Sequence, residues 1–379
     1  MYQKKLNVYN VAPFLVLLIV AILAIFSPPE LSFQDNVGAY NGADIAWILM
    51  ATALVFLMTP GLAFFYGGMV HRKNVISTMI KSVVATGVVT IIWVTVGYSL
   101  CFGDSIGGWI GNPTTHLFMK GVMSGKPWSL APTIPLGLFA LFQLMFAIIT
   151  PGLVVGAVAE RVKFTSYILF IVLFSLFVYA PIAHWTWHPE GFLFKMGALD
   201  FAGGTVVHIS AGCAALAGAL VLKRRKAHVE QREIPPANIP YVLIGTGLLW
   251  FGWFGFNGGS ALGANQLAVT AFVTTNTAAA SAGLSWMFFD VMRGKKPSVL
   301  GFCIGAVVGL VAITPSAGFV AVPQSIFIGF ATAIISNLAV YYKSKSKLDD
   351  TLDVFPCHGV GGMVGMLMTG IFATKSVTL

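Results

Sequence analysis

Long apolar runs separated by short polar connections make up most of the chain. Ten such runs of roughly 18 to 25 residues follow residue 40, and a helix needs about 20 residues to cross a bilayer. A barrel strand would instead alternate over about 10 residues. The pattern therefore predicts an all-α membrane protein. The runs lie at about 45–70, 75–101, 134–159, 165–183, 203–222, 240–257, 268–289, 299–314, 322–342 and 356–373.

An earlier and shorter apolar run extends from Val11 to Phe26, after Lys4 and Lys5. A basic start followed by a short apolar core is typical of a signal peptide or an N-terminal anchor. We therefore expect residues 1–34 to form a leader, either cleaved or retained, and residues 35–379 to form the membrane domain.

Composition agrees with a membrane setting, since 57% of the residues are hydrophobic and only 9% are charged. The formal net charge of +9 is unevenly placed: fifteen lysines and arginines fall in one set of alternate connections and four in the other. The positive-inside rule then puts the start of the first span and the C-terminus outside. We predict a multi-pass protein of the cytoplasmic membrane, with no nucleic-acid partner.

The basic stretch from Lys223 to Pro236 divides the ten runs into five and five. Because each half holds an odd number of spans, the two halves would have opposite topology. Inverted repeats are common in secondary transporters, whose substrate site lies between the repeats. We therefore predict repeat halves of about 44–222 and 240–373 around a central pore.

Two histidines lie in apolar surroundings, His208 inside the fifth run and His358 at the start of the tenth. Ionisable groups at membrane depth are costly and usually mark a pathway. The alternative is two buried histidines satisfied by main-chain carbonyls. Only Asp200 adds a ligand nearby in sequence, so we expect no metal site and no cofactor.

Asp200 and a group of aromatic residues precede or border the predicted pore. Asp200 can cap the fifth helix or raise the negative potential of a cation vestibule. Phe146, Trp187 and Phe256 fall at predicted outer ends, where aromatic belts are common. Together with a hydroxyl such as Ser260, they could also hold a small cation by cation–π contact.

Other polar residues suggest structural roles. Glu160 and Arg161 are expected to form an ion pair at the inner face, and Lys81 to extend its ammonium to the interface. The sequence contains no HExxH, GxSxG or Walker pattern, so we do not expect an enzyme. Four residues are expected to be small core residues: Cys101, Cys213, Cys303 and Cys357.

Six stretches carry a more specific pattern, and they occur in one order along the chain. They are Pro60 to Met69, Gln143 to Phe146, Gly156 to Arg161, Ala198 to His208, Trp253 to Ser260 and Asp353 to Gly362. Together they closely resemble the ammonium transporter (Amt/Mep/Rh) family, and especially its bacterial and archaeal Amt branch.

The resemblance implies an external site that recruits ammonium. Phe146, Trp187 and Ser260 would form this site, with Asp200 as the acidic residue that supports it. Phe146 would also act with Phe256 as the stacked pair that gates the pore.

The resemblance further implies that His208 and His358 are twin histidines lining the pore. Ammonium and potassium are similar in size and charge, but only ammonium has a proton to give. Desolvation favours its neutral form, so ammonia can cross a dry pore where potassium pays the full burial penalty. The proton would be relayed separately along the histidines.

Family members are homotrimers and normally continue into an eleventh helix and a cytoplasmic tail, whereas this sequence stops at Leu379. Because PII-type regulators act at that tail, we do not expect such regulation. The resemblance leaves open whether methylammonium is carried. The alternatives are a non-conducting ammonium sensor or a truncated relic, and, from a different class, a sodium-coupled transporter.

Overall fold

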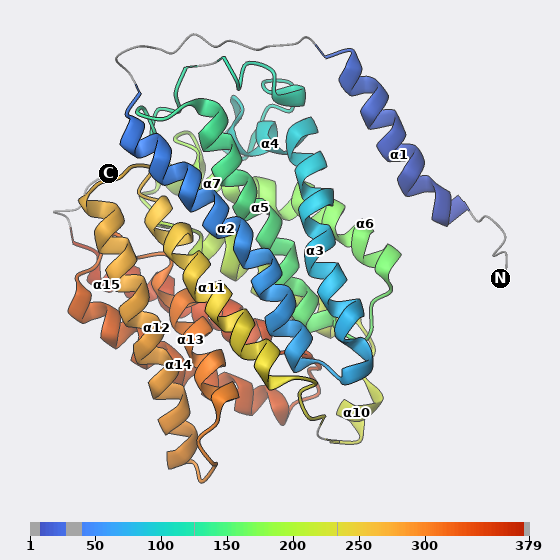
Figure 1. Ribbon diagram of the computed structural model, residues 1–379, viewed down its shortest axis with the longest axis vertical. Coiled ribbons are helices and arrows are strands. Elements are labelled where there is room, and N and C mark those ends of the chain that lie inside the picture. The colour runs from blue at the N-terminus through green and yellow to red at the C-terminus, as the bar shows by residue number, and fades with distance from the viewer. Residues whose placement is uncertain (1–7, 28–39, 125, 233, 375–379) are drawn as a thin grey trace.

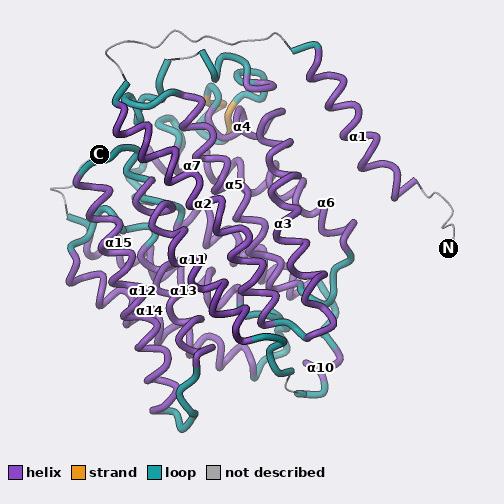
Figure 2. The backbone as a smooth tube through the Cα atoms, viewed as in Figure 1, coloured by secondary structure: helices purple, strands orange, loops and turns teal. Residues whose placement is uncertain are grey.

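The computed structural model of the protein describes residues 8–27, 40–124, 126–232 and 234–374. Helices account for most of these residues, and the loops gather at the two ends of the bundle (Figure 2). In one end loop the short strands β1 (Ser105–Ile106) and β2 (Ile110–Gly111) pair antiparallel. The prediction of an all-α membrane protein is confirmed.

The helices coincide with the predicted apolar runs. Nine helical stretches of the described residues are long and apolar enough to cross a membrane. The remaining run, at 299–314, forms the mostly buried helix α13 of 15 residues. The helices are α1 (Val8–Ile25), α2 (Gly42–Met69), α3 (Val75–Ile92), α4 (Tyr98–Phe102), α5 (Leu136–Val158), α6 (Phe164–Phe174), α7 (Ala180–Trp187), α8 (Phe192–Lys195), α9 (Ser210–Val221), α10 (Lys226–Val229), α11 (Ile239–Gly259), α12 (Gln266–Met292), α13 (Val299–Ile313), α14 (Val322–Ser344) and α15 (Gly361–Phe372).

Short turns of different pitch occur within several spans and in one connecting loop. The 3₁₀ turns are η1 (Arg72–Asn74) and η3 (Leu117–Met119). The π-helical turns are η2 (Trp93–Gly97), η4 (Ser175–Tyr179), η5 (Gly204–Ile209) and η6 (Phe355–Val360). π-Helical turns occur frequently at functional sites. Two of them, η5 and η6, contain His208 and His358.

The early helices α2 to α7 lie on one side of the bundle and α11 to α15 on the other (Figure 1). The two sides meet where α2 packs along α11 and where η5 and η6 touch. Helix α1 stands apart from the bundle. We call the end that carries the C-terminus the outer end and the opposite end, where α10 lies, the inner end, following the predicted orientation. The inverted repeat and the leader remain predictions, and part of the leader lies outside the described residues.

Two expectations about single residues were wrong. Glu160 does not pair with its neighbour but with Arg225, at 3.2 Å. Lys81 is a buried residue whose Nζ donates to the carbonyl of Val162, in the loop after α5, at 2.8 Å, and its reach to the membrane interface stays a prediction. Cys213 is exposed on α9, while the other three cysteines are buried.

Candidate functional site

The two predicted histidines meet at the centre of the bundle. Their Nδ1 atoms are 3.3 Å apart, and their rings lie nearly parallel with centroids 5.4 Å apart. Both side chains are buried. Residues 150 positions apart in sequence therefore form a direct imidazole pair.

This contact requires a very close approach of α9 to η6. A Cβ added to Gly212 would lie 2.3 Å from the Cα of Gly359, a distance that no side chain could occupy. Glycine at position 212 thus lets the two main chains touch. It brings His208, one turn before Gly212, within reach of His358, which directly precedes Gly359.

His208 is also in contact with an aromatic ring. Trp253 stacks on the imidazole with centroids 5.3 Å apart and planes 22° apart. The indole N–H of Trp253 donates to the Thr314 hydroxyl at 2.9 Å. Nε2 of His208 has no hydrogen-bond partner among the described residues, so this nitrogen is open to a ligand.

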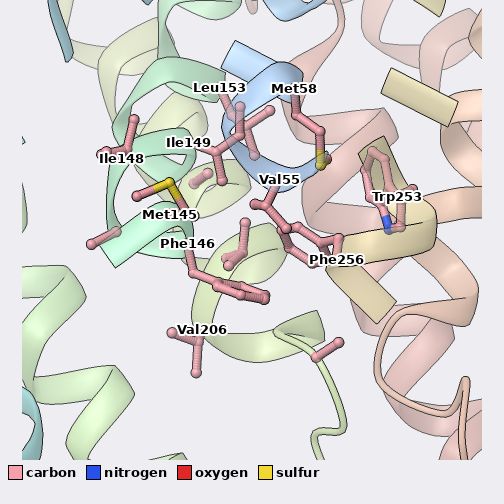
Figure 3. Packing of buried hydrophobic residues seen from close by; sticks show 14 of the residues in the cluster. Val55, Met58, Met145, Phe146, Ile148, Ile149, Leu153, Val206, Trp253 and Phe256 are labelled. Atoms are coloured by element: carbon pink, nitrogen blue, oxygen red, sulfur yellow. The ribbon is translucent and has the colours of Figure 1, made fainter. Parts of the chain in front are cut away.

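An aromatic pair lies directly outward from the histidines. Phe146 of α5 and Phe256 of α11 lie side by side (Figure 3), with ring centroids 4.3 Å apart. Both are buried. Phe256 also lies parallel to His208 at 6.0 Å. The order from outside is therefore Phe146, Phe256, His208 and His358.

Asp200 caps the outer end of η5, the turn that contains His208. Oδ1 accepts the N–H groups of Gly203 and Gly204, and Oδ2 accepts those of Thr205 and Val206, at 2.6–3.2 Å. Gly203 has a φ of +114°, a conformation that favours glycine and turns these donors toward the carboxylate. The predicted cap is confirmed. The carboxylate also complements the positive end of the helix.

The remaining predicted site residues lie around the aromatic pair. Trp187 meets Phe146 edge to face at 5.7 Å, and its indole N–H donates to the main-chain carbonyl of Asp200 at 3.0 Å. The Ser260 hydroxyl donates to the carbonyl of Phe256 at 2.8 Å. The structure therefore brings all the predicted site residues into one continuous arrangement.

Inward of the histidines lies a cavity of about 220 Å³ lined by His358, Tyr66 and Asp353. Asp353 also lines a second, charged pocket of about 560 Å³ with Arg225 and Lys343. The sequence did not predict these hollows, because their walls come from segments far apart in the chain.

A network of ion pairs closes the inner end around the charged pocket. Arg225 binds Asp349 at 2.8 Å and Glu160 at 3.2 Å. Burial raises the pKa of both carboxyl groups, but hydrogen bonds outweigh it and hold each pKa below its usual range. For Asp349 these bonds come mainly from Arg225, and for Glu160 from Asn74, the main chain of His71 and Arg225.

A second histidine pair lies in α7 and at its end, where the sequence suggested only loops or interfaces. His184 and His188 stack with centroids 4.4 Å apart. Both nitrogens of His184 are engaged, by the Cys101 carbonyl at 2.9 Å and the Ser105 hydroxyl at 2.8 Å. The i, i+4 spacing on a helix was the signal for this pair. Its contacts indicate a structural role.

The fold and the site define a multi-span membrane protein in which an aromatic pair covers a buried histidine pair. The model of the Ammonium Transporter Family matches residues 46–378, and the chain belongs to this family.

Similar proteins agree with this assignment. The chain is 48% identical to the ammonium transporter of Aquifex aeolicus, over 94% of this chain and 82% of the relative. The structure of Saccharomyces cerevisiae Mep2 matches with a TM-score of 0.86 and 39% identity, over 91% of this chain and 79% of Mep2. A structure named Sensor Amt Protein matches with a TM-score of 0.82 and 33% identity, over 89% and 84% of the two chains. Membership of a transporter family confirms that the chain is not an enzyme.

Proposed function

We propose that this protein carries ammonium across a cytoplasmic membrane, taking up the ion at the outer aromatic site and passing ammonia between the histidines. The observation that most supports this is the unbroken order Phe146, Phe256, His208, His358, with the inner cavity beyond. The higher identity to a relative named as a transporter supports conduction over a non-conducting sensor.

The outer site suits a small cation with N–H donors. The hydrogen of the Ser260 hydroxyl is used by the Phe256 carbonyl, so its lone pairs are left to accept from ammonium. Trp187 is fixed through its N–H, and it offers an aromatic surface for cation–π attraction. Asp200 adds negative charge behind this ring.

Passage through the aromatic pair requires loss of charge. Phe146 and Phe256 exclude water, and an ion that passes them gives up its hydration. Ammonium can avoid this cost by releasing a proton, whereas potassium cannot. The open Nε2 of His208 and its contact with His358 supply a route along which that proton can follow. Transport would then move net charge.

The proposal extends to assembly as a homotrimer with one passage per subunit. It includes methylammonium as an alternative substrate to be tested.

The test uses the purified chain in proteoliposomes on a solid-supported membrane. An ammonium jump should evoke a saturable current that potassium does not, and His208→Ala should reduce it. A folded protein with neither current nor tracer flux of ammonium would contradict transport and favour the sensor.

A further inference from the structure

Asp350 repeats at the inner end the position that Asp200 occupies at the outer end. Asp200 lies eight residues before His208, and Asp350 lies eight residues before His358. Asp200 accepts the first N–H groups of η5, and Asp350 accepts the N–H of Phe355 at 2.7 Å at the start of η6. Each histidine segment therefore begins at a buried carboxylate.

The two carboxylates differ in how their oxygens are used. Each oxygen of Asp200 accepts two N–H groups. Oδ2 of Asp350 accepts the Phe355 N–H, and the Val354 N–H also faces this carboxylate. Oδ1 makes no hydrogen bond of normal geometry among the described residues, although the side chain is 0% exposed. A buried anionic oxygen without a donor is costly. This oxygen is therefore a natural acceptor for a proton.

The charges around Asp350 do not neutralise it. Lys343 lies nearby, but its Nζ binds the carboxylate of Asp353 at 2.7 Å and only the main-chain carbonyl of Asp350 at 2.8 Å. Burial, followed by the charge of Asp353, raises the pKa of Asp350 to about 6. The charged and titratable groups around Asp350 are Asp349, Asp353, Lys343, Arg161, Tyr66 and Cys357.

Asp350 lies behind the wall of the inner cavity, next in sequence to Thr351, which lines it. Tyr66 and Cys357 line that cavity together with His358, and both lie near enough to Asp350 for its charge to act on them. A volume of about 220 Å³ is enough for several water molecules. Water in this cavity would place a proton leaving His358 one wall of side chains, Tyr66 and Cys357, from the Asp350 carboxylate.

We propose that Asp350 accepts the proton that leaves the histidine pair at the inner end. The inference rests on the proposed function. A ring nitrogen of protonated His358 loses its proton and keeps the electron pair, and Oδ1 of Asp350 gains the proton to become a neutral carboxylic acid. The acid then releases the proton to water on the inner side, which restores the carboxylate for the next cycle.

Asp353 is the competing acceptor, since it lines the inner cavity together with His358. Its carboxylate is bound to Lys343 at 2.7 Å, and a close positive charge favours the ionised form and so weakens a proton acceptor. The simpler role for Asp350 is to cap η6. Asparagine separates the two roles, because its amide oxygen can still accept the Phe355 N–H but cannot take up a proton.

The experiment compares the full chain with Asp350→Asn and Asp350→Glu in proteoliposomes. Glu230→Gln is the matched control. It also removes one acidic charge at the inner end, but from an exposed side chain directly after α10. Current after an ammonium jump and alkalinisation inside the vesicles, which reports ammonia entry, are recorded on the same preparation. Melting temperatures show that each variant is folded.

We expect Asp350→Asn to lower the current about tenfold or more while ammonia entry persists, and Asp350→Glu to restore part of the current. Wild-type current should also fall as the inner pH drops through about 6, because a protonated acid cannot accept. An unchanged current in Asp350→Asn, or equal loss in the Asn and Glu variants, would overturn the inference. Absence of wild-type current and flux would instead contradict the proposed function itself.

Discussion

Trp253 joins two parts of the site: its ring stacks on His208 at 5.3 Å, and its indole N–H donates to Thr314 at 2.9 Å. The Thr314 hydroxyl in turn donates to the carbonyl of Leu310 at 2.7 Å. A hydroxyl at the end of α13 thereby sets the orientation of a ring on α11, and that ring supports the histidine of η5.

Replacing Thr314 with valine keeps the side-chain shape but removes the acceptor of the Trp253 N–H. A buried donor left unpaired costs about 1–3 kcal/mol, so we expect a lower melting temperature. The ammonium current should fall severalfold because the ring that supports His208 is less firmly held. Thr277→Val is the control, since that hydroxyl donates to the carbonyl of Val273 in its own helix, α12, at an exposed position. Equal effects of both changes on the current would argue against a role for Thr314 in positioning.

Replacing Asp200 with alanine leaves the N–H groups at the start of η5 without their acceptor. We expect the free energy of unfolding to fall by on the order of 3 kcal/mol or more. The apparent affinity for ammonium should also fall, because the side-chain bonds that anchor residue 200 are lost and its main-chain carbonyl then holds Trp187 less firmly. Thermal unfolding and the concentration dependence of the current check both effects. The exposed outer residue Asp104 provides the control variant Asp104→Ala, and a similar loss of affinity there would contradict the assignment.

Replacing Phe146 with alanine opens the dry region above His208. We expect the preference for ammonium over potassium to decrease, since a wider, wetter passage lowers the burial cost of a potassium ion. Currents evoked by the two ions in the same vesicles measure this ratio. Phe251→Ala removes a ring that is 55% exposed on α11 and should leave the ratio unchanged. Retained selectivity in Phe146→Ala would show that this ring is not the barrier.

Replacing Arg225 with glutamine leaves Asp349 and Glu160 without their common partner. Breaking a largely buried ion pair costs about 3–5 kcal/mol. We therefore expect the free energy of unfolding at pH 7 to fall by about 3 kcal/mol. The exposed Lys226, which pairs only with Glu230, gives the control Lys226→Gln, for which we expect no measurable change.

The same ion pairs predict a pH dependence. Folding lowers the pKa of Asp349 and Glu160 from ordinary values of 3.8 and 4.5. Their stabilisation is therefore fully present above those values and is lost as the pH falls through the lower folded values. The difference in stability between the wild type and Arg225→Gln should narrow below about pH 4. If the stability difference between the two proteins stayed constant down to pH 3, the ion pairs of Asp349 and Glu160 would not be its cause.

The spans were predictable because apolar run length alone specifies helices that cross a bilayer. Partners distant in sequence were not. Glu160 has Arg225 rather than its neighbour as partner, since the end of α5 and the loop after α9 meet only in the folded bundle. The partner of Lys81 was not predictable for a similar reason: the Val162 carbonyl that accepts its hydrogen bond follows a different helix.

The site residues were predicted through resemblance, while their supports were not. The hydroxyl of Thr314 and the π-helical turns leave no periodic signal in the sequence. The inner carboxylate is different, because the equal spacing from Asp200 to His208 and from Asp350 to His358 is visible in the sequence. What the sequence could not show is that one of the four carboxylate oxygens is left without a donor.

The approach of Gly212 to Gly359 makes the histidine contact depend on both parts of the chain at once. Neither part forms the passage alone, since each supplies one imidazole and one glycine of the contact. Even an added methyl group at position 212 would act as a wedge, and it would separate the imidazoles without touching either one. We therefore expect substitutions at the contact between the two parts of the chain to be tolerated least, even where they lie away from the permeating molecule.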